Sequence, residues 1–221
     1  MSNARNLANL LGTNTTVPRA KQPAGSVLQC VTTNYPDDFT FTLSNGSSSD
    51  NGKIEVATGL NCSITPTSTS SKILYQATVY IGSDSMYDLG IHIIKNATAT
   101  TATTSSTDTS PCGGSYLTDA SGNLIKGQAS GTTPRATGVL NLYRQASGSA
   151  TTPTYMINPT SMILLDHPNT ASQITYNFAM SFYNWDTQAI YLNRSHLNQQ
   201  HGGGLYDTNP VSTVTLMEIA G

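Results

Sequence analysis

The chain has 221 residues, with 10 Lys plus Arg against 12 Asp plus Glu, a formal net charge of −2 and only 10% charged residues. An average soluble domain carries about 25% charged residues, and a nucleic-acid-binding domain needs a basic patch that neutralises phosphates, so we expect no binding to nucleic acid. No run approaches the roughly 18 apolar residues of a membrane-spanning helix, and the first residues lack the pattern of a secretory signal, so we expect neither membrane insertion nor a cleaved leader.

The start of the chain has the pattern of a short amphipathic helix followed by a linker. A helix this short forms only against a partner, and a frayed terminus is the alternative interpretation. The residues that follow, up to residue 24, carry two Pro and no apolar periodicity, which is typical of an extended arm. We therefore predict that residues 1–24 form an attachment arm and linker, short and helical or extended. The residues predicted to form the contact with a partner or with a second copy share one helix face: Ala4, Leu7, Ala8 and Leu11.

From residue 25 onward the apolar residues recur with a period of two, which indicates half-buried strands. The alternation is clearest over residues 174–183 and 73–81. Because no helical pattern separates the strands to make crossovers, they must be mainly antiparallel. The sequence therefore predicts an all-β head over residues 25–221, an antiparallel β-sandwich or jelly-roll-like domain. Nine strands are expected, at residues 27–33, 60–65, 73–81, 89–95, 139–144, 161–165, 174–183, 189–194 and 211–219.

Cysteine and histidine give little support for a disulfide framework or a metal site. The three cysteines, Cys30, Cys62 and Cys112, are odd in number and far apart, so we expect free, buried thiols. His196 and His201 are the strongest metal candidates, but a spacing of five residues in a loop fits no rigid chelating pattern. A single histidine near a three-fold axis could supply three ligands. We nevertheless predict no metal and no cofactor.

The sequence gives little support for catalysis. Glu occurs only at positions 55 and 218, the Asp residues lie mostly in turn contexts, and no G-x-S-x-G motif is present. The pair Asp166-His167 is followed by a Pro in a turn after a strand, which does not suit a catalytic triad. Three successive glycines at 202–204 precede neither Lys-Ser/Thr nor a helix, so we interpret them as a surface loop rather than a phosphate-binding loop. We expect a non-enzymatic protein.

Aromatic residues near strand ends suggest a recognition surface. Tyr183, Trp185, Tyr191 and Tyr206 lie among amide and histidine side chains, a mixture that suits stacking on sugar rings or docking against a protein. The alternative is that Tyr183 and Tyr191 simply cover the outer face of a sheet. The candidate receptor-binding residues are Trp185, His196, His201, Gly202, Gly203, Gly204 and Tyr206.

Five segments carry a resemblance to a known group of proteins: MSNARNLANLLG at the start, GSVLQCV at 25–31, SITPTSTSSKILYQATV at 63–79, DHPNTASQITYNFAMSF at 166–182 and VSTVTLMEIAG at the end. Together they resemble marine bacteriophage virion structural proteins of the tail-fibre or appendage type, found particularly in cyanophages. The resemblance implies a trimeric jelly-roll-like head behind an N-terminal segment that attaches to the particle. Residues 96–159 depart from the compact members of the group and have the character of an insertion.

These observations lead to a functional expectation with three alternatives. We expect a homotrimeric tail fibre or appendage, made in the host bacterial cytoplasm and located on the virion, that binds other virion proteins through its arm and a host surface glycan or protein through its distal loops. The first alternative is a capsid decoration or head-fibre protein, which would be found over the head of the particle. A carbohydrate-binding module would be a monomer. A depolymerase would shorten polysaccharide, and the small number of carboxylates disfavours it.

Overall fold

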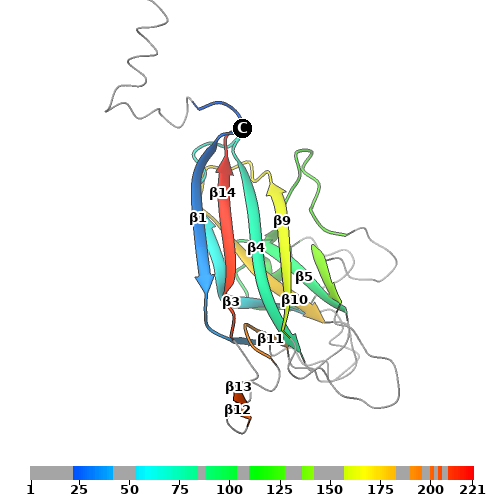
Figure 1. The fold of residues 1–221 in the computed structure, drawn as a ribbon. Coiled ribbons are helices and arrows are strands. Elements are labelled where there is room, and N and C mark those ends of the chain that lie inside the picture. The colour runs from blue at the N-terminus through cyan, green and yellow to red at the C-terminus, as the bar shows by residue number, and fades with distance from the viewer. Residues whose placement is uncertain are drawn as a thin grey trace, which may run out of the picture.

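The protein is an antiparallel two-sheet β-sandwich, which confirms the all-β prediction (Figure 1). The structure is a computed structural model, and it describes residues 22–41, 53–83, 88–103, 110–127, 136–141, 157–182, 190–195, 200–201, 204–205 and 209–221. In this part of the chain there is no α-helix, and no helix is long and apolar enough to cross a membrane. The predicted helical arm, including Ala4, Leu7, Ala8 and Leu11, lies outside the described residues.

The first sheet, sheet A, has the strand order β1-β14-β4-β11-β2, and β9 pairs with the other edge of β4. Its long strands lie side by side across the front of Figure 1. The short strand β11 continues beyond β14 along the same edge of β4 and then pairs with β2. The strands of sheet A are β1 (Val27–Tyr35), β2 (Phe39–Phe41), β4 (Lys72–Ser83), β9 (Ile157–Asp166), β11 (Ile190–Leu192) and β14 (Ser212–Ile219).

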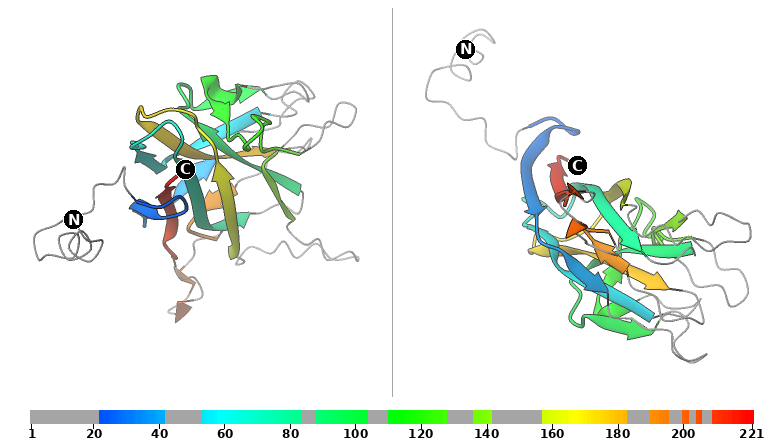
Figure 2. Two further views of the ribbon diagram at one scale, coloured as in Figure 1. Left: turned by 90° about the horizontal axis from the view of Figure 1, so that it is seen from above. Right: turned by 60° about the horizontal axis from the view of Figure 1, so that its bottom comes forward.

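The second sheet, sheet B, packs behind sheet A and has the order β6-β3-β10-β5-β7, with β8 also paired to β5 (Figure 2). Three of its strands, β6, β7 and β8, lie within the predicted insertion at 96–159, and the last three residues of that segment, 157–159, begin β9 of sheet A. A separate two-stranded hairpin consists of β12 (Gln200–His201) and β13 (Gly204–Leu205). The strands of sheet B are β3 (Lys53–Ile64), β5 (Asp88–Lys95), β6 (Thr101–Thr103), β7 (Ser115–Tyr116), β8 (Gly138–Asn141) and β10 (Ile174–Phe182).

The main core lies between the two sheets and follows directly from the alternation in the sequence. Ile73, Tyr75 and Ala77 of β4 point inward and meet Tyr176 and Phe178 of β10, all at most 2% exposed. The rings of Tyr75 and Tyr176 have centroids 6.0 Å apart. Burial of these apolar faces stabilises the sandwich by about 25 cal/mol for each Å² removed from water.

A second, smaller core lies on the outer side of sheet B. Ile54, Val56, Ile94 and Ala179 are buried there together with Cys112 of the short 3₁₀ turn η2 (Pro111–Gly113). The Thr-rich stretch that precedes η2 is attached by backbone hydrogen bonds, among them Thr98 N to Cys112 O at 2.9 Å and Val56 N to Thr100 O at 2.8 Å. The chain therefore covers this part of the outer side itself, and β10 is buried on both sides although its second face is mostly small or polar.

All nine expected strands are present, and the differences concern short elements and one cysteine. Five strands were not predicted: β2, β6, β7, β12 and β13, each two or three residues long. The prediction of three buried thiols was wrong for Cys30, which is exposed because it points outward from the edge strand β1; Cys62 and Cys112 are buried, and all three are free. Beyond the named strands, an isolated β-bridge joins Thr118 and Leu124.

Candidate interaction surface

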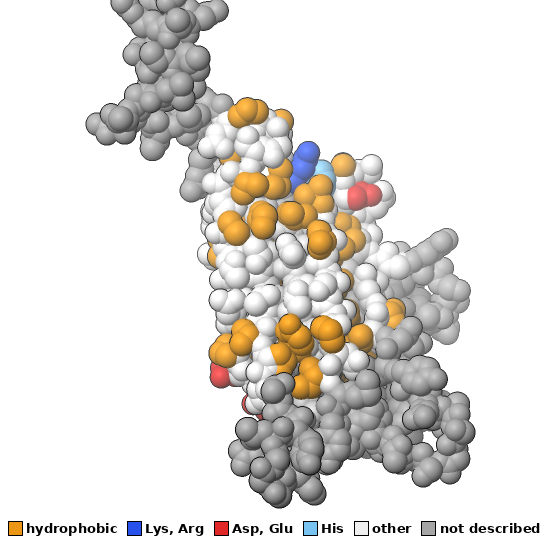
Figure 3. All heavy atoms as spheres, viewed as in Figure 1, with side chains coloured by type: hydrophobic (Ala, Val, Ile, Leu, Met, Phe, Trp, Pro, Cys, Tyr) orange, Lys and Arg blue, Asp and Glu red, His pale blue; other side chains and the backbone are white. Residues whose placement is uncertain are grey.

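The outer side of sheet A forms a broad face, which we call the front face because it points toward the viewer in Figure 3. Alternation within each strand sends every second side chain to this side, and the inward residues between them are buried in β4 and β14 and half-buried in β1 and β9. The front face consists of Cys30, Thr32 and Asn34 of β1, Thr213, Thr215, Met217 and Ile219 of β14, Lys72, Leu74, Gln76, Thr78 and Tyr80 of β4, and Pro159, Ser161, Ile163 and Leu165 of β9.

Strand register organises the front face into chemically distinct rows. One row across the four strands is apolar: Cys30, Met217, Leu74 and Leu165 are successive partners. The next row toward the β11 end ends in Ile163, which is 66% exposed, while Leu165 is 41% exposed. Side chains in the same row lie about 5 Å apart, so they form a continuous strip rather than isolated apolar residues.

Hydroxyl groups fill the middle of the front face and pair with one another. Thr32 Oγ1 lies 3.1 Å from Thr215 Oγ1, and Thr78 Oγ1 lies 3.1 Å from Ser161 Oγ. These cross-strand pairs explain the pale band between two orange zones in Figure 3. Lys72, at one end of the face, is the one charged side chain among the outward positions of these four strands, since Glu218 and Asp166 are buried.

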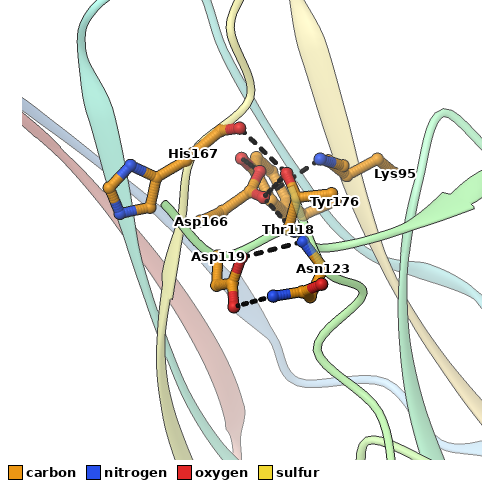
Figure 4. Close-up of polar contacts among 7 residues, drawn as sticks. All are labelled: Lys95, Thr118, Asp119, Asn123, Asp166, His167 and Tyr176. Atoms are coloured by element: carbon orange, nitrogen blue, oxygen red, sulfur yellow. Dashed lines mark hydrogen bonds and ion pairs between the residues drawn. The ribbon is translucent and has the colours of Figure 1, made fainter. Parts of the chain in front are cut away.

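Asp166 is the centre of a buried polar cluster that connects the two sheets (Figure 4). Its carboxylate lies at the end of β9 and is 0% exposed. It accepts hydrogen bonds from Lys95 Nζ of β5 at 3.0 Å, Tyr176 Oη of β10 at 2.7 Å and Thr118 N at 2.7 Å. Burial, followed by the negative charge of Asp166, raises the pKa of Tyr176, so this phenol stays protonated and donates.

The same cluster holds the hairpin that follows β7. Thr118 Oγ1 donates to the carbonyl of His167, and the amide of His167 donates to the carbonyl of Thr118. Beyond Thr118, the Asp119 carboxylate accepts hydrogen bonds from the Ser121 and Asn123 amides and from Asn123 Nδ2. These bonds within the turn lower the pKa of Asp119, those from Asn123 most. All partners of Asp119 are internal to its turn, which favours a structural role.

Glu218 forms a second buried carboxylate cluster at the same end of the sandwich. It accepts hydrogen bonds from Thr67 N, Thr67 Oγ1 and Ser71 Oγ at 2.6 Å each, and from Gln29 Nε2 at 2.6 Å. Burial raises the pKa of this carboxyl group, but the donors, Ser71 first, outweigh it and hold the pKa below its ordinary value. The carboxylate thus fastens the loop between β3 and β4 to β14.

The two ends of the described chain meet beside this cluster. Gly25 N donates to Ala220 O, and Ala220 N donates to Ser26 O, each at 2.8 Å. A pocket of about 200 Å³ opens next to them, and its lining includes Gln22 and Gly221. We call this region the arm end, because residues 22–25 lead into β1 there.

A third buried polar cluster, in sheet B, is centred on the side chain of His92. His92 Nδ1 is 2.9 Å from Tyr116 Oη, and His92 Nε2 is 2.7 Å from Ser181 Oγ. Burial, and to a smaller degree the charge of Lys126, lowers the pKa of His92 to about 3, so the imidazole is neutral at pH 7. His92, Ser181 and Tyr116 are at most 1% exposed, which leaves the serine hydroxyl out of reach of a substrate in this structure.

Two of the candidate receptor-binding residues belong to the small hairpin, where His201 of β12 pairs with Gly204 of β13. Trp185, His196, Gly202, Gly203 and Tyr206 lie outside the described residues. The predicted surface loop over the glycines therefore contains two short strands.

Tyr191 was one of the aromatic residues proposed for recognition, and the structure supports the covering role instead. It is 8% exposed, and the Arg194 guanidinium lies 3.7 Å from its ring centroid. Arg194 Nε also forms a 2.8 Å ion pair with Asp38. The ring is therefore already occupied on its outer side and is not a free stacking platform.

Sequence reasoning missed the front face and the two carboxylate clusters. The outward positions of β4 and β14 can be identified in the sequence, because they alternate with the buried positions. Only the pairing of the strands, however, shows that these outward side chains form one surface. No family model and no curated protein matches the chain. Within the described residues no group of three or more His, Cys, Asp or Glu is arranged to hold a metal ion.

Proposed function

We propose that this protein is a non-enzymatic structural component of a bacteriophage virion, a homotrimeric tail fibre or appendage that attaches through its N-terminal arm and presents loops at its far end for host recognition. The sequence resemblance in five segments supports the phage assignment. One structural observation supports assigning attachment and host recognition to different parts of the molecule: the arm end and the β12–β13 hairpin lie at opposite ends of the sandwich (Figure 1).

This polarity follows from how the strands are connected. Residues 22–25 enter β1 beside the C-terminal residues, and the buried carboxylates of Glu218 and Asp166 fix the loops around that end. The hairpin that contains His201 and Gly204 extends from the other end. An attachment protein needs a firmly held base and a separate end for recognition, and the opposite placement of these two parts supports the proposal.

Trimeric assembly makes weak recognition effective. Three copies of one loop on a rigid head bind a surface with far higher avidity than one copy, even when each site is weak. The low charge of the chain, 10% of its residues, suits subunits that bury neutral faces against one another.

The first test is the mass of the full-length chain in solution, measured by light scattering. The proposal predicts a particle of three times 23.4 kDa. A version that starts at Gly25 then shows whether the head or the arm holds the trimer together. A stable monomer over the accessible concentration range would contradict the trimeric fibre.

The second test locates the protein on the particle. Antibodies against the recombinant chain, coupled to gold, should label the tail appendages of the phage that encodes it. Label over the head would instead indicate the decoration or head-fibre alternative, and particles without label would overturn the virion assignment.

Deletion of Gly202–Gly204 should reduce adsorption to host cells; unchanged adsorption would remove this loop from the recognition surface.

A further inference from the structure

We infer that the front face is the surface through which copies of this chain contact one another, around a rotation axis that runs along the strands of sheet A. The inference rests on the proposed homotrimer and names the surface that forms it. Its starting point is an asymmetry between the two sheets. The chain's own residues 97–103 and 110–113 cover part of the outer side of sheet B, around β3 and β10, whereas none of the described segments crosses the front face (Figure 1).

The exposed apolar groups on the front face are gathered, not scattered. Ile163 and Leu165 are next-but-one neighbours on β9, 66% and 41% exposed, and Leu165 continues into the row of Leu74, Met217 and Cys30. Isolated exposed apolar side chains are ordinary, but a contiguous strip on an otherwise ordered sheet is typical of an interaction surface.

The near absence of charged side chains on the front face indicates which kind of partner it can bind. A nucleic acid or an anionic membrane would need several basic side chains, and a strongly charged protein would need complementary charges, but this face offers only Lys72. A neutral face of hydroxyl and apolar groups is complemented by another face of the same kind. A second copy of this chain provides such a face, and contact between the two copies buries no unpaired charge except near Lys72.

The paired hydroxyl groups lower the desolvation penalty of burying the front face against a second copy. The pairs Thr32–Thr215 and Thr78–Ser161 already provide a hydrogen bond within each row. Moving them out of water therefore leaves fewer unsatisfied donors than an unpaired row of Ser and Thr would leave.

The order of the rows determines the direction of the axis. A rotation about an axis parallel to the strands leaves the height of each row unchanged, so the apolar row of one copy meets the apolar row of the next and hydroxyl rows meet hydroxyl rows. In that arrangement β1 of one copy approaches β9 of its neighbour, which places Cys30 close to the neighbour's Leu165. All arm ends then lie at one end of the assembly, as attachment to a single socket requires.

The exposed thiol of Cys30 is a built-in reporter for this contact. It is the only one of the three free cysteines that a single subunit exposes, since Cys62 and Cys112 are buried. In the assembled wild-type protein the reaction of Cys30 with a thiol reagent such as Ellman's reagent should be at least about tenfold slower than in a dissociated variant, because the reagent must wait for dissociation.

The deciding variant is Ile163→Glu in the full-length chain, with Val139→Glu as its matched control. Val139 lies on β8 of sheet B and is 60% exposed, so both changes place a carboxylate at a similarly exposed strand position on opposite sides of the sandwich. Ile163→Glu should fold, have the mass of a monomer and react at Cys30. Val139→Glu should keep the wild-type mass and the protected thiol. Thermal melting monitored by circular dichroism confirms that each variant is folded.

The outcomes separate this inference from the proposed function. A wild-type trimer in which Cys30 reacts at the rate of the free thiol, or an Ile163→Glu protein that remains trimeric, overturns the front face as the contact and leaves the trimer standing. A wild-type monomer overturns the trimer and the inference together. Dissociation by both variants alike would show a general effect of added charge and would also overturn the assignment to the front face.

Discussion

Tyr75 and Tyr176 face each other across the main core, yet their hydroxyl groups have different surroundings. Tyr176 Oη donates to Asp166 at 2.7 Å, whereas Tyr75 Oη is buried and has no hydrogen-bond partner among the described residues. Burial raises the pKa of both phenols, so both are neutral. A buried hydroxyl without a partner is destabilising relative to a plain aromatic ring.

Tyr75→Phe should therefore stabilise the protein. Removing the unpaired hydroxyl while keeping the ring should raise the free energy of unfolding by about 1 kcal/mol. Urea denaturation of the variant and the wild type measures the difference. Tyr176→Phe is the control, because it removes a donor to a buried carboxylate and should lower the free energy of unfolding. A loss of stability in Tyr75→Phe would show that its hydroxyl has a partner.

His92 should make the folded state sensitive to acid. Its pKa is about 3 in the folded protein against 6.5 as the ordinary value. Below pH 6.5 the unfolded chain therefore binds a proton at this imidazole that the folded chain does not. The free energy of unfolding should fall by about 1.4 kcal/mol for each pH unit below 6.5, and the contribution ends near pH 3.

Urea denaturation at pH 7, 6 and 5 tests this, because the carboxylates remain largely ionised over that range. His92→Gln keeps a side chain that can hydrogen-bond to Ser181 and Tyr116 but does not titrate. Its stability should depend less on pH than that of the wild type, whatever its absolute stability. Equal slopes in the two proteins would contradict the assignment to His92.

At the scale of the elements, the Asp166 cluster holds four pieces of the chain together. Asp166 ends β9 of sheet A, and Lys95 and Tyr176 belong to β5 and β10 of sheet B. The amide of Thr118 brings in the hairpin after β7. Removing one partner of a buried ion pair leaves the other charge uncompensated, which is strongly destabilising.

Asp166→Asn should lower the free energy of unfolding by about 3 to 5 kcal/mol, because the Lys95 ammonium loses its counter-charge in a buried site. Combining it with Lys95→Met in a double-mutant cycle should recover part of the loss. Asp119→Asn, a change at an exposed turn, should have a much smaller effect in the same chemical denaturation. Additive effects of the Asp166 and Lys95 changes would argue against their coupling.

All strands of four or more residues could be predicted from the sequence, and among the strands of two or three residues only β11 could. In β4 and β10 the alternation runs over nine or more residues, so local pattern alone specifies the buried face. β6 and β7 have two or three residues and exist because β3 and β5 offer them a paired edge. Burial of the second face of β10 could not be predicted either, because it depends on a Thr-rich stretch that has no apolar pattern.

At the scale of the whole molecule, the small number of charges predicts an assembly that tolerates salt. Because the front face contributes only Lys72, screening should change the contact little. The dissociation constant of the oligomer, measured by sedimentation, should change by less than about threefold between roughly 0.05 and 0.5 M NaCl. Weakening by tenfold or more would indicate that charged groups form the contact.

The sequence by itself determined the all-β class, the antiparallel arrangement and the positions of nine of the strands, because each depends on local periodicity and on the absence of helical connections. The tertiary structure alone decided which residues form a surface. Cys30, Met217, Leu74 and Leu165 are far apart in the chain and become one row only through strand register. Likewise Asp166 becomes a link between sheets only when Lys95, Thr118 and Tyr176 surround it, because hydrogen bonding depends on distance in space and not along the chain.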